Sequence, residues 1–115
     1  MKKAYDAESA DRLVPFLEAT HREIRERADQ VRRLENRLRL LSEDERTVSP
    51  VHSALSIHRR EIREAKRELR RLGCEVEEFG PFQVLIPGAD GRLEHGFAWT
   101  AGDSGVRPVE TDTAA

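Results

Sequence analysis

The sequence is poor in the residues that build a cross-linked or membrane-spanning protein. It has one cysteine, Cys74, so no disulfide can form within the chain, and we expect a reducing, cytoplasmic location. Its apolar runs are far shorter than the roughly 20 residues that a transmembrane helix needs, so we expect no membrane partner. Lys2 and Lys3 are followed by no apolar run, and we therefore expect no secretory signal.

Aromatic residues are also scarce, at 5% of the 115 residues, whereas 37% are charged. This composition is typical of solvated helices, and the length suits one domain with a modest core. Motifs of common enzymes are missing, because we find no Gly-rich phosphate loop and no Ser-centred nucleophile elbow. Cys74 belongs to no nucleophile motif. We therefore expect no catalytic residues, no cofactor and no enzyme activity.

Charge is distributed unevenly along the chain. Residues 22–71 hold 15 Arg and Lys against 10 Asp and Glu, a balance of +5, whereas the rest holds 5 basic and 12 acidic residues, a balance of -7. The two balances give the net charge of -2. The middle of the chain is therefore positive, and the flanking parts taken together are negative.

Apolar residues recur every seven positions over much of residues 9–73. The first series is Ala10, Leu17, Ile24, Val31 and Leu38, and the second is Leu55, Ile62 and Leu69. A second apolar position lies within most repeats. This spacing predicts two helices wound around each other in an antiparallel hairpin.

Residue types predict where these helices begin and end. Asp6 is a good N-cap, so the first helix is predicted over residues 6–41, with a kink near Pro15 because proline lacks a backbone donor. The polar residues 42–49 predict the turn, in which Ser49 caps the next helix. The second helix is predicted over residues 50–72, beginning at a proline and ending before a capping glycine.

The pattern changes to a period of two after the second helix and predicts an antiparallel β-meander over residues 74–110. Strands are expected at 74–79, 82–86, 92–100 and 106–109, with Pro108 keeping the last one at an edge. Residues 111–115 are predicted to be a disordered tail.

The predicted fold class is α+β in a single domain, residues 1–115. It is a long antiparallel two-helix coiled-coil hairpin with a small C-terminal antiparallel β-meander. The first helix is longer than the second, so that Leu13, Phe16 and Leu17 lack a helical partner. We expect the meander to cover them.

Four segments of the chain resemble the bacterial domain-of-unknown-function family 2203. They are YDAESADRLVPFL at 5–17, GCEVEEF at 73–79, IPGADGR at 86–92 and AWTAGD at 98–103. The resemblance covers nearly the whole chain. It implies a coiled helical hairpin, a Gly-x-x-Val strand entry and a short β segment, and it implies no known function.

The chain departs from that family's pattern at several polar positions. Leu85 stands where the family has an Asp before the strand-ending Pro, and Ala98 stands where it has a Cys before the Trp. Val109 and Glu110 replace a Trp-His pair, and Asp103 replaces a Glu. If those residues form a site in relatives, this chain lacks most of it.

The histidines give one minor hypothesis, a metal-dependent activity that involves His58 or His95. His58 occupies a seam position opposite Leu34, which favours a partly buried imidazole that hydrogen-bonds its neighbours. His95 is expected to pack among apolar neighbours of its strand. His52 lies at the wrong helical rotation to share an ion with His58, so we expect no metal site.

The run 58–71 holds seven Arg and Lys against three Glu. Five of the basic residues face away from the seam and are candidates for phosphate contacts: Arg59, Arg63, Lys66, Arg67 and Arg70. The interleaved glutamates favour a salt-bridged, solvated face, and the segment has no aromatic residue on which a base could stack. Binding of nucleic acid or another polyanion is therefore an alternative that is not favoured.

Self-association is the favoured hypothesis, because two helices bury only one stripe each and such hairpins often pair into four-helix bundles. Val14, Leu40 and Ile57 lie off the seam and are the predicted self-association residues. A positive shaft and negative flanking parts favour antiparallel docking of two copies. The sequence thus predicts a non-catalytic helical-hairpin interaction module that forms a homo-oligomer, either a dimer or a tetramer.

Overall fold

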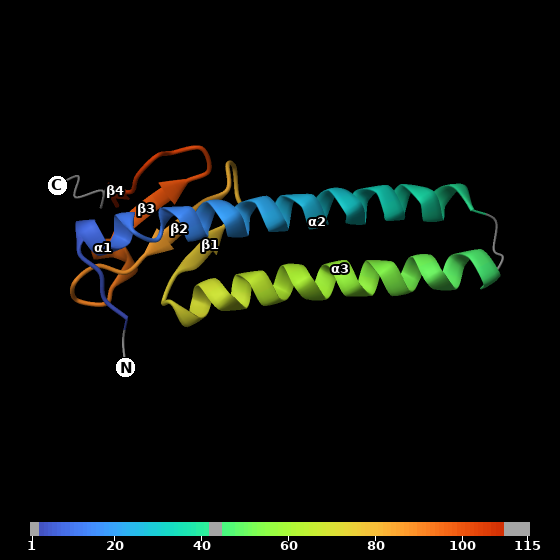
Figure 1. Ribbon diagram of the computed structural model, residues 1–115, viewed down its shortest axis with the longest axis horizontal. Coiled ribbons are helices and arrows are strands. Elements are labelled where there is room, and N and C mark those ends of the chain that lie inside the picture. The colour runs from blue at the N-terminus through green and yellow to red at the C-terminus, as the bar shows by residue number, and fades with distance from the viewer. Residues whose placement is uncertain (1–2, 42–44, 110–115) are drawn as a thin grey trace. The chain divides into compact units, whose positions relative to one another are not determined.

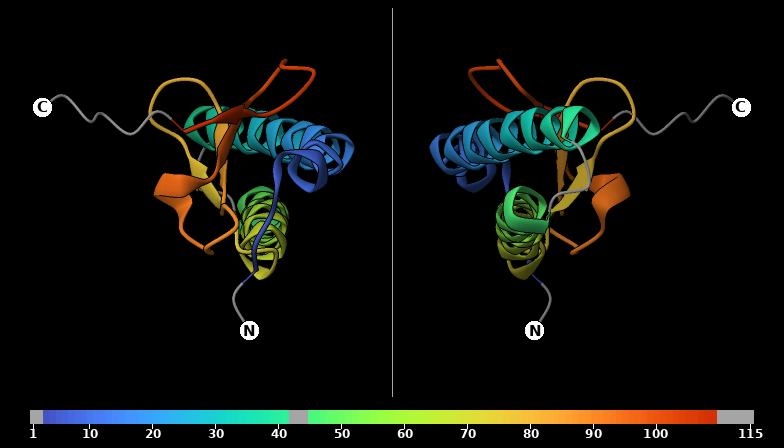
Figure 2. Two further views of the ribbon diagram at one scale, coloured as in Figure 1. Left: turned by 90° about the vertical axis from the view of Figure 1, so that its left-hand side faces the viewer. Right: turned by 90° about the vertical axis from the view of Figure 1, so that its right-hand side faces the viewer.

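The computed structural model describes residues 3–41 and 45–109, so the predicted tail at 111–115 lies outside the described residues. The chain divides into two compact units. We call them the sheet unit, Met1–His21 with Lys66–Ala115, and the helical unit, Arg22–Ala65. Figure 1 labels their helices and strands, and Figure 2 shows the same elements from two further directions.

The first helical stretch consists of two helices. α1 (Ala7–Asp11) begins at the predicted cap, where the N–H of Ser9 donates a hydrogen bond of 2.8 Å to Asp6. α2 (Val14–Leu40) follows after a break of two residues, so the prediction of one kinked helix is wrong. Pro15 cannot donate to the carbonyl four residues earlier. The helix therefore stops and restarts with the proline in its first turn, where no donor is needed.

The next helix, α3 (Glu45–Arg71), begins before Pro50, the residue at which the sequence predicted its start. Pro50 lies inside the helix instead. Val48 is half-buried and Val51 is only 5% exposed, so apolar packing continues on both sides of the proline and favours helix there. Residues 42–44 of the predicted turn lie outside the described residues.

In the helical unit, α2 and α3 run antiparallel and side by side (Figure 1). The buried residues of this unit are Ile24, Val51, Leu55 and Ala65. Large apolar residues that stay half-buried include Val31, Leu34, Leu38 and Ile62. The α+β class is confirmed by these helices together with the sheet described next, whereas coiled-coil winding stays a prediction.

The sheet unit contains a four-stranded antiparallel sheet in the order β1-β2-β3-β4. The strands are β1 (Glu75–Glu77), β2 (Gln83–Ile86), β3 (Phe97–Thr100) and β4 (Arg107–Pro108). The predicted meander is therefore confirmed, with Pro108 on an edge strand. One row of the register joins Glu75, Leu85, Ala98 and Arg107 across the sheet.

The prediction of a strand over residues 92–100 is wrong for the first half of that range. Leu93–His95 form a short 3-10 helix (η1), and β3 begins only at Phe97. The register shows why, because the ladder of β2 with β3 ends at the pair Ile86 and Phe97. The next residue after β2 is Pro87, which has no N–H to continue the ladder.

The core of the sheet unit packs α1, the start of α2 and the end of α3 against one face of the sheet. Its buried members are Ala10, Val14, Leu17, Leu69, Cys74, Val84, Ile86 and Trp99. The predicted cover over Leu17 is confirmed, whereas Phe16 remains 38% exposed. Val14 is only 5% exposed, which corrects its interpretation as a residue on the protein surface. Val14 lies three positions before Leu17, on the same side of α2, and both pack in one core with Val84, Ile86 and Trp99 of the sheet.

Candidate functional site

The helical unit has a groove of about 480 Å³ between α2 and α3. Its lining residues are Glu35, Leu38, Arg39, His52, Leu55 and Arg59. Leu55 is 2% exposed and Leu38 is half-buried, so the floor of the groove is part of the apolar seam. At the rim, Nη2 of Arg59 donates a hydrogen bond of 3.2 Å to Oε1 of Glu35. An apolar floor inside a charged rim is the usual anatomy of a protein-binding surface.

Leu40 and Ile57 are exposed, as the sequence predicted, by 87% and 49%. Leu40 lies two positions after the groove residue Leu38, and Ile57 lies two positions after Leu55. Each is therefore rotated by about 200° around its helix, away from the groove. The two side chains thus lie on the outer sides of different helices. They do not form one continuous patch with each other.

The predicted basic face of α3 is partly neutralised. Besides the pair of Arg59 with Glu35, Nζ of Lys66 lies 2.6 Å from Oε1 of Glu78, and Arg67 is also engaged. Arg63 and Arg70 are the remaining members, and both are exposed. Arg59 and Arg63 belong to the helical unit, whereas the other three candidates belong to the sheet unit. A guanidinium or ammonium group that is already paired with a carboxylate neutralises fewer phosphates and so releases fewer counterions from a polyanion. We therefore expect weaker polyanion binding by this face than the sequence indicated.

The two histidines of the metal hypothesis are held in different ways. His58 is half-buried, and Nη1 of Arg27 lies 3.2 Å from its Nδ1, in line with the expected hydrogen-bonded imidazole. His95 is exposed, which corrects its predicted apolar packing, and its Nδ1 lies 2.5 Å from Oδ2 of Asp90. The hydrogen bond from His95, followed by that from the N–H of Arg92, lowers the pKa of Asp90. Within residues 3–41 and 45–109, no three His, Cys, Asp or Glu side chains gather as a metal site requires.

Cys74 is a structural thiol. It is 1% exposed, and burial raises its pKa to about 11. The protonated thiol is a poor nucleophile, so this cysteine is unreactive near neutral pH. Tyr5 closes the same end of the core, where its hydroxyl donates a hydrogen bond of 2.9 Å to the carbonyl of Leu72. Burial also raises the pKa of Tyr5.

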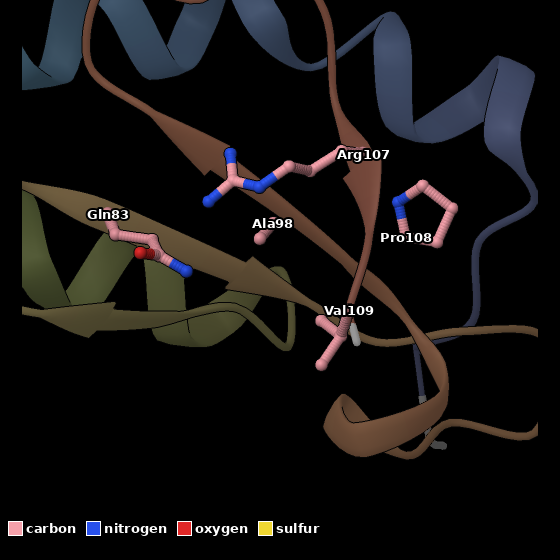
Figure 3. A pocket seen from close by; sticks show the side chains of 5 residues that line it. All are labelled: Gln83, Ala98, Arg107, Pro108 and Val109. Carbon is pink, nitrogen blue, oxygen red and sulfur yellow. The ribbon is translucent and has the colours of Figure 1, made fainter. Parts of the chain in front are cut away.

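A second hollow, of about 320 Å³, lies on the sheet unit and was not predicted from the sequence (Figure 3). Its lining residues are Gln83, Ala98, Arg107, Pro108 and Val109. They come from β2, β3, β4 and the residue that follows β4, and the strand register brings them together. The period-two alternation, which places Ala98 on the face opposite Phe97 and Trp99, was the only sequence signal of this surface.

Comparison with known proteins gives one family. The family described as Uncharacterized conserved protein (DUF2203) matches residues 3–109. No curated protein and no solved structure matches the chain. Among the described residues, no helix has both the length and the apolar character needed to cross a membrane.

Proposed function

The chain belongs to the DUF2203 family of uncharacterized conserved proteins, and we propose that it is a non-catalytic interaction module that associates with a second copy of itself. The single observation that carries this proposal is the groove of the helical unit. Its apolar floor is open between α2 and α3, and no third helix covers it among the residues of that unit that the structure describes.

Packing of the helical unit supports an additional layer. A pair of helices buries one stripe of each, and here Val31, Leu34, Leu38 and Ile62 are only half-buried along that stripe. Each large apolar side chain gains about 1.5–3 kcal/mol when it passes from exposed to fully buried. A second helical pair laid on the groove would complete the burial, which is the arrangement of a four-helix bundle.

Charges at the rim of the groove favour a second copy as the occupant. Glu35 and Arg39 both line it, and they lie one helical turn apart on α2. Around a two-fold axis, Arg39 of one copy can face Glu35 of the other, and the reverse contact follows by symmetry. The same rim provides both signs of charge, so the surface is complementary to itself.

Light scattering of the full chain after size exclusion tests the proposal. Arg39→Glu changes a rim residue that is exposed, so the helices should form and the oligomeric mass should fall toward that of a monomer. Arg37→Glu is the matched control, because it makes the same change of charge on the same helix outside the groove. Equal masses for both variants would remove the groove as the interface.

The outer sides of the helices need their own variant. Leu40→Glu combined with Ile57→Glu changes the exposed apolar residues without altering the lining of the groove. We expect this double variant to keep the oligomeric mass of the wild type. A lower mass with this variant, and an unchanged mass with Arg39→Glu, would move the interface to the outer sides.

A further inference from the structure

We infer that the hollow on the sheet unit binds a small monocarboxylate, meaning a free carboxylate with a short apolar tail. The site lies on the face of the sheet opposite the core, in the row that contains Ala98 and Arg107. This inference is independent of self-association, because every residue that it uses belongs to the sheet unit.

The floor of the hollow is small and fixed. Ala98 is 3% exposed in the middle of β3, between its register partners Leu85 and Arg107. Its methyl group leaves space above the sheet that a longer side chain would fill. Val109 forms one wall, and its N–H donates a hydrogen bond of 3.0 Å to the carbonyl of Gly96, which fixes Val109 beside the start of β3.

Arg107 provides a positioned cation. Its Nη1 donates a hydrogen bond of 3.1 Å to Oδ2 of Asp103, and that oxygen also accepts one of 3.3 Å from the N–H of Thr100. The carboxylate of Asp103 is thus held by the backbone and orients the guanidinium in turn. Figure 3 shows this guanidinium extending over Ala98 toward the side of the sheet where Gln83 lies. Its other nitrogens bond to none of the residues that the structure describes, so they can donate to a ligand.

Gln83 provides the second polar group. It is half-buried on β2, and its side-chain amide makes no hydrogen bond to any of the residues that the structure describes. In Figure 3 the amide extends toward Ala98 from the side opposite Val109. An amide N–H and a guanidinium that converge on one small space form a suitable receptor for two carboxylate oxygens.

Charge and shape select a monocarboxylate from among the small anions. Asp103 already neutralises part of the charge of Arg107, so a dianionic phosphate would be repelled more strongly than a single carboxylate. The Pro108 ring and Val109 offer apolar surface to a short tail. A volume of about 320 Å³ fits a ligand of a few carbon atoms, near the lower end of small-molecule sites.

Nuclear magnetic resonance of the full chain tests the inference, with isobutyrate as the probe. We expect saturable shifts of the Gln83 side-chain amide and of the Ala98 backbone amide. Isobutyramide has the same shape without the charge, and inorganic phosphate has charge without the tail, so both should leave these signals unshifted at equal concentration. Absence of saturation with isobutyrate, or equal shifts with isobutyramide or phosphate, would overturn the inference.

Variants locate the binding. Arg107→Gln should weaken isobutyrate binding by about tenfold or more, because it removes a charged hydrogen-bond donor. Arg92→Gln is the matched control, since Arg92 is also an exposed arginine of the sheet unit but does not line the hollow. Binding that survives Arg107→Gln, or that is lost equally in Arg92→Gln, would show that the anion binds elsewhere.

Discussion

The backbone N–H of Val106 donates a hydrogen bond of 2.9 Å to Oδ1 of Asp11, which joins residues far apart in the sequence. Asp11 is the last residue of α1, and Val106 directly precedes β4. This bond therefore ties the break in the first helical stretch to the edge of the sheet. Gly105 makes the approach feasible, since a Cβ there would lie 3.2 Å from the same oxygen.

Asp11→Ala should lower the free energy of unfolding by about 1 kcal/mol, the usual value of such a hydrogen bond. Asp11→Asn is the matched control, because its amide oxygen can still accept from Val106. Urea unfolding followed by circular dichroism measures both variants. If the alanine variant is as stable as the wild type, the bond contributes nothing to the fold.

The position of Pro50 inside α3 gives a second prediction. Pro50→Ala should raise the free energy of unfolding by about 2 kcal/mol, because the helix regains a backbone donor and loses a clash. The gain is smaller than the full cost of an interior proline, since alanine makes the unfolded chain more flexible.

Pro15→Ala is the control for that experiment. Pro15 is the second residue of α2, where the missing N–H has no partner within the helix, so the change should stay within about 0.5 kcal/mol. Thermal unfolding of both variants gives the comparison. A Pro50→Ala variant no more stable than Pro15→Ala would instead support a helix that begins at Pro50.

Burial of Cys74 predicts a dependence of stability on alkaline pH. The pKa of the thiol is raised from 9.0 to about 11, so between these values the unfolded chain releases a proton that the folded chain keeps. The contribution of Cys74 to the free energy of unfolding should therefore be constant below pH 9 and fall by about 2 kcal/mol toward pH 11.

Cys74→Ala should remove most of this slope. Burial raises the pKa of Tyr5 above its ordinary value of 10.0, so this group acts in the same direction and accounts for a remainder. Denaturant unfolding at a series of alkaline pH values measures the slope. Identical slopes in the wild type and the variant would show that the thiol does not ionise on unfolding.

The partly paired basic face predicts weak binding of polyanions. With Arg59 and Lys66 in ion pairs, we expect no binding of a duplex DNA of roughly 20 base pairs at roughly 150 mM salt. Fluorescence anisotropy of a labelled duplex makes the measurement. Tight binding that falls steeply with salt, and that Arg63→Glu with Arg70→Glu abolishes, would establish the basic face as a nucleic-acid site instead.

Local residue chemistry predicted much of the fold. Asp6 caps α1, Gly73 adopts a positive φ of 84° after α3, and the alternation around Val84 and Trp99 gave the strands and the core. The errors arose where packing outweighed a local signal. Pro50 has the residue chemistry of a helix start, yet apolar residues on both sides of it favour an uninterrupted helix.

Sequence patterns could not predict the two hollows, because each depends on the pairing of distant segments. Gln83, Ala98 and Arg107 meet only through the register of three strands, and no local spacing specifies that register. The groove of the helical unit likewise needs the alignment of Glu35 with Arg59. Val14 was misplaced for a related reason, because the helical seam alone did not show that the sheet would bury it together with Leu17.

Sedimentation equilibrium of the wild-type chain, over a wide range of concentrations, tests the central claim most directly. The account predicts a mass that approaches two or four times the 13.1 kDa of one chain as the concentration rises. A mass of 13.1 kDa at every concentration would contradict it. In that case the groove between α2 and α3 does not bind a second copy.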